Sequence, residues 1–243
     1  MTATKNSKQK LDMVIRILYP RRCPVCQIIV TEKGYVCREC KQQLPYIKEP
    51  RCKKCGKSLD SEVQEYCFDC TKGHHVFDKG IALWQYTKSM KQSIHRFKYD
   101  NKREYADFYI EEILKHYGTW IESLQVDAVI PVPLHRSKQR SRGFNQAELL
   151  AKGIGKALQI PVEAKVVERY RKTKVQNVLN DTERKNNVKK AFKIAGNVVK
   201  LKKVLLVDDI YTTGSTIDAI AEVLKEVGVE QVYICCLCAG RGY

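Results

Sequence analysis

Residues 202–216 constrain the fold of this chain more than any other stretch. The segment from Val204 to Val207 is apolar at every position, and Asp208 and Asp209 follow it directly. A short continuous apolar run of this kind predicts a strand buried on both faces, as in a parallel sheet. The apolar positions from Ile217 onward recur at helical spacing, so the stretch predicts a buried strand, a loop and an amphipathic helix.

The loop between that strand and helix has the composition of a phosphate site. It combines small hydroxyl side chains with a glycine, and its residues are Thr212, Thr213, Gly214, Ser215 and Thr216. Glycine lets the backbone approach a ligand closely, and a helix N-terminus offers unpaired N–H groups. The carboxylates of Asp208 and Asp209 suit ribose hydroxyls or a magnesium ion carried by a phosphate. The stretch therefore predicts a sugar-phosphate pocket, and the alternative is an ordinary strand–turn–helix with a Ser/Thr cap.

This stretch resembles the phosphoribosyl pyrophosphate (PRPP) motif of the type I phosphoribosyltransferases. The resemblance implies that Asp208 and Asp209 hold the ribose 2′- and 3′-hydroxyls and are the catalytic candidates. It also implies that residues 212–216 wrap the 5′-phosphate, with magnesium bound together with PRPP.

Strands and helices alternate from residue 127 onward, which predicts an open parallel sheet with right-handed crossovers. A strand over 127–133 is followed by a basic loop, and in the resembled family this loop grips pyrophosphate. Its candidate residues here are Leu134, His135, Arg136, Arg140 and Arg142. A helix is expected from Phe144 and a strand over 161–167. Residues 168–190 are polar and lack clean periodicity, which is typical of a functional lid. Its candidate residues are Thr173, Gln176 and Arg184.

Four Cys-x-x-Cys pairs lie within residues 21–76, ten or eleven residues apart. The pairs are Cys23/Cys26, Cys37/Cys40, Cys52/Cys55 and Cys67/Cys70. Two such knuckles can close a tetrahedron of thiolates around Zn²⁺, so the segment predicts two structural zinc sites in tandem ribbons. We expect consecutive pairing, although cross-braced pairing and a redox dithiol are alternatives. His74 and His75 are expected to be solvent-exposed rather than ligands.

The ribbons themselves favour two interpretations equally. Basic residues between the knuckles, with aromatic residues interleaved, are typical of nucleic-acid or partner binding; they are Arg38, Lys41, Arg51, Lys53, Lys54 and Lys57. Alternatively the ribbons are a structural support. The remaining cysteines, Cys235, Cys236 and Cys238, lack the spacing of ligands and are expected in the core.

The formal net charge of +17 favours a polyanionic partner or a polyphosphate substrate over a neutral one. Two zinc ions held by four thiolates each would lower it to about +13, and a solvated basic surface without a partner is the alternative. No apolar run is long enough to span a membrane, and the Lys-rich N-terminus lacks a signal-peptide core. We therefore expect a cytoplasmic protein, with any contact to the inner face of the membrane made through partners.

Three further sequence patterns, together with the ribbons, indicate a narrower family. They are Phe97-Lys98-Tyr99, the run from Pro131 to His135 continued by Arg142 to Gln146, and the series Thr173, Gln176, Leu179, Arg184 and Asn187 before Ala191-Phe192. With them the chain resembles the ComF-type proteins of the ComFC/GntX group, which are associated with DNA uptake during natural transformation. The resemblance implies a competence factor that binds PRPP and single-stranded DNA and acts with a ComFA-type helicase/translocase.

The expected organisation is thus a lead-in helix over residues 1–20, a double zinc ribbon over 21–76 and a phosphoribosyltransferase-like α/β domain over 77–243. Two functions remain open. One is a DNA-uptake adaptor with a phosphoribosyl ligand, and the other is an active magnesium-dependent phosphoribosyltransferase with an unknown acceptor. No residue pattern identifies an acceptor pocket, so whether the protein is an enzyme stays open.

Overall fold

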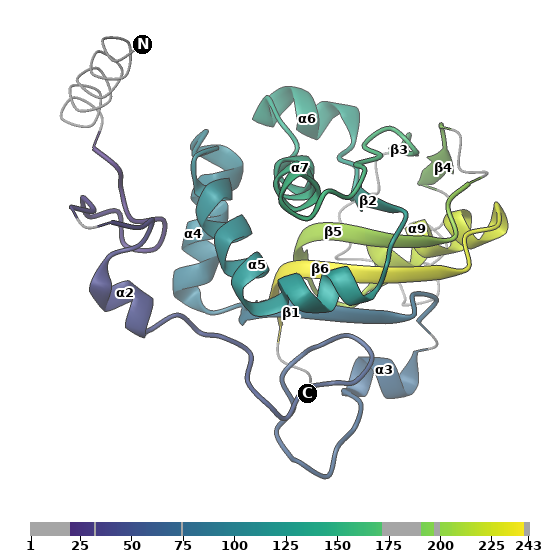
Figure 1. Cartoon of the computed structure of the whole chain (residues 1–243), viewed down its shortest axis with the longest axis horizontal. Helices are drawn as coiled ribbons and strands as arrows, with labels where there is room; N and C mark the ends of the chain where they lie inside the picture. Colours follow the sequence, from purple (N-terminus) through teal and green to yellow (C-terminus); the bar gives the residue numbers. More distant parts are fainter. Residues whose placement is uncertain (1–19, 32, 74, 172–190, 197–199, 241–243) are drawn as a thin grey trace, which may run out of the picture. The chain divides into compact units, whose positions relative to one another are not determined.

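A computed structural model describes residues 20–31, 33–73, 75–171, 191–196 and 200–240 (Figure 1). The chain divides into two compact units, Met1–Leu44 and Pro45–Tyr243, which are described separately. The expected lead-in helix lies almost wholly outside the described residues. Within the described part of the chain, no helix has the length and apolar character needed to cross a membrane.

A four-stranded parallel sheet forms the centre of the larger unit, with the strand order β1-β6-β5-β2. The strands are β1 (Lys79–Gln85), β2 (Ala128–Pro131), β5 (Lys203–Tyr211) and β6 (Gln231–Ala239). The predicted open parallel α/β sheet is confirmed. Because β5 lies between β6 and β2, its apolar run is covered by neighbours along both edges and by helices on both faces.

The helices of the larger unit cover both faces of the sheet (Figure 1). The covering helices are α4 (Lys88–Tyr99), α5 (Tyr105–Ser123), α7 (Gln146–Leu158) and α9 (Ser215–Glu226), while the short helix α6 (Arg136–Arg142) has no buried residue. Val204 and Leu206 of β5 share a buried cluster with Ile220 and Leu224 of α9. The three late cysteines are fully buried in β6, as expected for small core residues.

The second half of the ribbon segment belongs to the core of this larger unit. Cys52, Cys55, Leu59 and Cys67 lie in the same buried cluster as β5 and α9. The backbone of this segment also pairs along β1, since the Gly80 N–H donates to the Lys54 carbonyl over 2.7 Å and the Ile47 N–H donates to that of Leu83 over 3.0 Å. The edge strand β1 is therefore covered by the ribbon rather than by solvent.

The short helices α2 (Arg38–Gln42) and α3 (Phe68–Lys72) follow the second knuckle of each ribbon. Cys37 is the N-cap of α2 and Cys67 is the N-cap of α3. The two ribbons thus repeat one local structure, in agreement with the duplication in the sequence.

Two segments differ from the sequence-based expectation. The basic stretch expected as a loop winds into α6, because the His135 side chain accepts the Ser137 N–H and Gly143 ends the helix in the left-handed region at φ 74°. The expected strand over 161–167 pairs with β2 only at Val162. Residues Val167–Arg169 instead form β3, antiparallel to β4 (Phe192–Ile194), in a separate two-stranded sheet.

Candidate functional site

The carboxylate pair lies where β5 approaches its end and the chain turns into α9. Asp208 is partly buried and Asp209 is 8 % exposed. The Asp208 carboxylate accepts the N–H of Asp209 over 2.8 Å, which fixes its orientation. The pair opens at the carboxyl edge of the sheet, where open α/β sheets bind their ligands.

Asp209 is held by a cation from another helix. The Lys98 ammonium, at the end of α4, donates to the Asp209 carboxylate over 2.8 Å, and both side chains are largely buried. Lys98 was not among the candidate site residues, although it stands in the Phe97-Lys98-Tyr99 pattern. Sequence spacing gave no signal for this contact because 111 residues separate the two groups.

Burial and the neighbouring Asp209 raise the pKa of Asp208 to about 7. Lys98 and Arg169 oppose this shift by favouring the ionised form. Because two adjacent carboxylates in one partly buried place repel each other, the pair favours a cation, hydroxyl donors or a magnesium ion in front of it.

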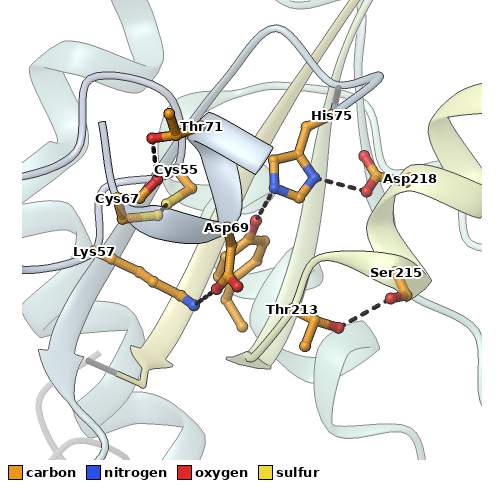
Figure 2. A network of polar contacts seen from close by, with 10 residues as sticks. Cys55, Lys57, Cys67, Asp69, Thr71, His75, Thr213, Ser215 and Asp218 are labelled. Atoms are coloured by element: carbon orange, nitrogen blue, oxygen red, sulfur yellow. Dashed lines mark hydrogen bonds and ion pairs between the residues drawn. The ribbon is translucent and has the colours of Figure 1, made fainter. Parts of the chain in front are cut away.

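The phosphate loop, defined here as residues 212–216, follows immediately. Gly214 caps α9 with φ 82°, a conformation that favours glycine. The Thr213 and Ser215 hydroxyls lie 2.9 Å apart, and Thr212 and Thr213 are exposed (Figure 2). The loop thus presents hydroxyls and the first N–H groups of α9 on one side, which is the donor set a phosphate needs.

Further cations lie near Lys98 and the carboxylate pair. Arg169 of β3 is close enough to Asp208 to affect its pKa, and burial lowers the pKa of Arg169 itself. Partial burial, Arg169 and Arg142 together lower the pKa of Lys138. Within the described ranges, no carboxylate forms an ion pair with Lys138 or Arg142.

The residues expected to bind pyrophosphate make different contacts in the structure. Arg142 donates to the Tyr99 hydroxyl over 2.8 Å and borders a cavity of about 230 Å³ with Lys138 and Ser141. Arg136 pairs with Glu168 over 2.6 Å, and His135 caps α6. Leu134 is partly buried and Arg140 is exposed. The lid candidates Thr173, Gln176 and Arg184 lie outside the described residues.

The eight ribbon cysteines gather into two sets of four. The sets are Cys23, Cys26, Cys37 and Cys40, and Cys52, Cys55, Cys67 and Cys70; within each set the sulfur atoms all lie within 4.8 Å of one another. The Cys26–Cys37 and Cys55–Cys67 sulfur distances are each 3.6 Å. A tetrahedral zinc–thiolate site requires about 3.8 Å. This geometry is that of consecutive rather than cross-braced pairing.

The sulfur atoms of each set need a cation to ionise together. Burial raises the pKa of Cys37 to about 11, and burial with neighbouring thiols raises that of Cys40 further. The Cys52, Cys55 and Cys67 sulfur atoms raise the pKa of Cys70, whereas hydrogen bonds from Cys55, Cys67 and Cys70 lower that of Cys52, so the four thiols do not ionise alike. Four thiolates at this spacing are stable only around a positive ion, so both clusters are consistent with structural zinc sites.

One expectation about the ribbon surface is wrong. His75 is not solvent-exposed, because its side chain is 6 % exposed and contacts Asp218. Lys57, one of the basic residues between the knuckles, is 3 % exposed and pairs with Asp69 over 2.6 Å. His74 lies outside the described residues.

Two known protein families match different parts of this chain. Residues 14–71 match the double zinc ribbon domain, and residues 141–243 match the phosphoribosyl transferase domain. These two matches define the class, a protein with an N-terminal double zinc ribbon and a phosphoribosyltransferase domain. Among solved structures, a purine phosphoribosyltransferase from Pyrococcus horikoshii is 19 % identical with a TM-score of 0.33, covering 54 % of this chain and 74 % of its own.

Curated relatives narrow this class. Competence protein F of Haemophilus influenzae is 32 % identical over 225 residues, covering 88 % of this chain and 94 % of the relative. Competence protein ComFC of Streptococcus pneumoniae is 30 % identical over 210 residues, with 84 % and 88 % covered. The DNA utilization protein YhgH of Escherichia coli K12 is 30 % identical over 193 residues, with 77 % and 83 % covered. The chain belongs to the ComF/YhgH family of competence and DNA utilization proteins.

Proposed function

We propose that this ComF-family protein binds PRPP, or a closely related phosphoribosyl ligand, together with magnesium at the carboxyl edge of β5. The observation that carries the proposal is the position of Asp208 and Asp209 beside a left-handed Gly214 and the N-terminus of α9. The carboxylates accept the ribose hydroxyls, the phosphate loop holds the 5′-phosphate, and Lys138 and Arg142 face the pyrophosphate. Magnesium, carried by the pyrophosphate, would neutralise charge that these cations leave uncompensated.

The test is equilibrium binding of PRPP with Mg²⁺ by calorimetry. Replacing both carboxylates (Asp208→Asn with Asp209→Asn) should weaken binding by about tenfold or more, because two charged acceptors of ribose hydroxyls are lost. Glu122→Gln, an exposed change at the end of α5, is the matched control. Unchanged affinity in the double variant would show that the ligand binds elsewhere.

We further propose that the protein acts on single-stranded DNA during uptake, in partnership with a ComFA-type helicase/translocase. The support comes from family membership and from the large positive charge of the chain. The phosphoribosyl ligand then has a regulatory or structural role. Co-purification of the two proteins, with and without PRPP, tests the partnership, and a complex that never forms in either condition would contradict it.

An active phosphoribosyltransferase is the second candidate. It is favoured by the cations near the carboxylate pair, since Lys138, Arg142 and Arg169 would stabilise a departing pyrophosphate. Pyrophosphate release in the presence of Mg²⁺ and a panel of bases, nucleotides and oligonucleotides tests it. Release above the rate of the double Asn variant would establish turnover, and equal rates would exclude it for that panel.

A further inference from the structure

The second zinc ribbon reaches the phosphate loop through one short segment of chain. Cys67 and Cys70 lie at the N-terminus and middle of α3, and the chain leaves α3 toward His75 and Val76. Figure 2 shows His75 pointing from this segment to Asp218 in the first turn of α9. Ser215 and Thr216 of the phosphate loop are the first two residues of that turn. The segment that follows the second four-cysteine cluster therefore contacts the helix whose N-terminus would hold the phosphate.

The contact with α9 is made by both a side chain and the backbone. The Nδ1 atom of His75 lies 2.7 Å from one carboxylate oxygen of Asp218, and the Val76 N–H donates to the other over 2.9 Å. The His75 side chain is 6 % exposed and that of Asp218 is 20 % exposed. The Asp218 carboxylate thus connects two consecutive residues, His75 and Val76, to the first turn of α9.

Tyr211 provides a second connection between the ribbon segment and the loop. Its hydroxyl lies 3.5 Å from the Nε2 atom of His75, and its ring packs edge-on against Phe77. The buried ammonium of Lys57 lies 5.3 Å from the centroid of the same ring, while it pairs with Asp69 of α3. Tyr211 is 1 % exposed, so the residue that begins the turn is enclosed by the ribbon.

The phosphate loop itself touches these supports. A Cβ atom placed on Gly214 would lie 2.6 Å from the Tyr211 hydroxyl and 2.9 Å from Cε1 of His75. The backbone at the left-handed turn is therefore in close contact with both side chains. Moving His75 or Tyr211 leaves the turn without the surfaces that hold its position.

We propose that the second four-cysteine site acts as the support of the phosphate loop, with His75 and Asp218 as positioning residues, so that loss of metal at this site weakens phosphoribosyl binding. The proposal rests on the proposed function for its ligand. The first four-cysteine site belongs to the other compact unit and is not expected to have this effect.

The chain offers a matched pair of variants for the test. Cys67→Ser and Cys37→Ser each remove one zinc ligand from the N-cap of an equivalent short helix, and serine is itself a good N-cap. Each should lower the zinc content from two ions per chain toward one. Cys67→Ser should weaken PRPP binding by about tenfold, within the usual range of coupling between sites, while Cys37→Ser should leave it within about twofold. Equal effects of the two variants on affinity would overturn the proposal.

His75 provides a test that leaves the zinc ligands intact. His75→Phe keeps an aromatic ring beside Phe77 but removes the contact with Asp218, and it should weaken PRPP binding with two zinc ions still bound. His75→Asn retains a donor near the position of Nδ1 and should recover most of the affinity. A PRPP affinity unchanged in His75→Phe, or lost only together with zinc, would contradict a positioning role.

Hydrogen–deuterium exchange without ligand separates this proposal from the proposed function. Exchange of the peptide covering residues 211–218 should rise in Cys67→Ser and His75→Phe and stay at the wild-type level in Cys37→Ser. If wild-type protein does not bind PRPP, the proposed ligand is wrong, but this measurement still decides whether the ribbon supports the loop. Exchange that is the same in all variants would show that it does not.

Discussion

At the scale of single residues, Asp208 combines two requirements that oppose each other. Its place beside Asp209 suits ribose hydroxyls and magnesium, yet burial and that neighbour raise its pKa to about 7. In the absence of ligand the protein therefore bears a cost for keeping this carboxylate ionised near neutral pH. Functional sites commonly store this kind of strain, and a bound ligand relieves it.

We predict that Asp208→Asn stabilises the ligand-free protein at pH 8 but much less at pH 5. The folded-state pKa of about 7 exceeds the ordinary value of 3.8, so between these values the folded state binds more protons than the unfolded state. Between pH 5 and pH 8 the wild type thus loses stability, on the order of 2–3 kcal/mol, and the uncharged amide does not. Denaturant unfolding at both pH values measures the difference.

Glu122→Gln is the control for this comparison, because its side chain is exposed at the end of α5. A gain in stability for Asp208→Asn that is equal at pH 5 and pH 8 would show that the carboxyl group titrates in the ordinary range instead.

At the scale of secondary structure elements, α9 joins the phosphate loop to the core. Its apolar face packs on β5, its N-terminus faces the proposed ligand site, and its first turn is bound to the second ribbon through Asp218. Gly214 and Gly228 flank the helix, and both have positive φ. A Cβ atom on Gly214 would meet close neighbours, whereas one on Gly228 would meet none within 4 Å. Comparing the two positions therefore distinguishes the cost of the left-handed backbone from the cost of a steric clash.

We predict that Gly214→Ala weakens PRPP binding strongly and destabilises the protein by about 1–3 kcal/mol, because the added Cβ clashes with Tyr211 and His75 and the backbone is strained. Gly228→Ala, at φ 97° with nothing within 4 Å, carries the conformational cost alone and should keep its PRPP affinity. Thermal unfolding and calorimetry on both variants measure the two effects. Full PRPP affinity in Gly214→Ala would mean that the loop does not approach the ligand closely.

At the scale of the whole molecule, the dominant features are the net positive charge and the two four-cysteine clusters. The chain carries 44 Lys and Arg residues against 27 Asp and Glu, and zinc at both clusters lowers the surplus only to about +13. Several cations are already committed, since Lys57 is buried in an ion pair and Lys98 neutralises Asp209. The remaining surface charge is still large enough to attract a nucleic-acid backbone.

We predict that single-stranded oligonucleotides bind with strong salt dependence. If about four phosphates are neutralised, the logarithm of the affinity should fall with the logarithm of salt concentration at a slope of about −3. Fluorescence anisotropy across a range of about 50 to 300 mM salt measures this slope. Binding that does not change with salt, or no binding at low salt, would contradict an electrostatic nucleic-acid surface.

Much of this architecture was predictable because the signals are local. The apolar run of β5, the carboxylate pair with its glycine loop, and the four Cys-x-x-Cys pairs each depend on neighbours in sequence. The parallel sheet then follows from the alternation of strands and helices. The basic stretch before Gly143 was expected as a loop because charge masks the helix signal there, whereas the His135 cap and the left-handed glycine decide for a helix.

The sequence alone therefore determined the buried strand, the glycine turn that follows it and the two four-cysteine clusters, since residues at short spacing specify each of them. Only the tertiary structure decided what surrounds them. It brought Lys98 to Asp209 and His75 to Asp218, contacts that span 111 and 143 residues. It also placed the second four-cysteine cluster in the core that holds the phosphate loop. Such contacts arise when the packing of the core brings distant segments together, and no local pattern in the sequence encodes that packing.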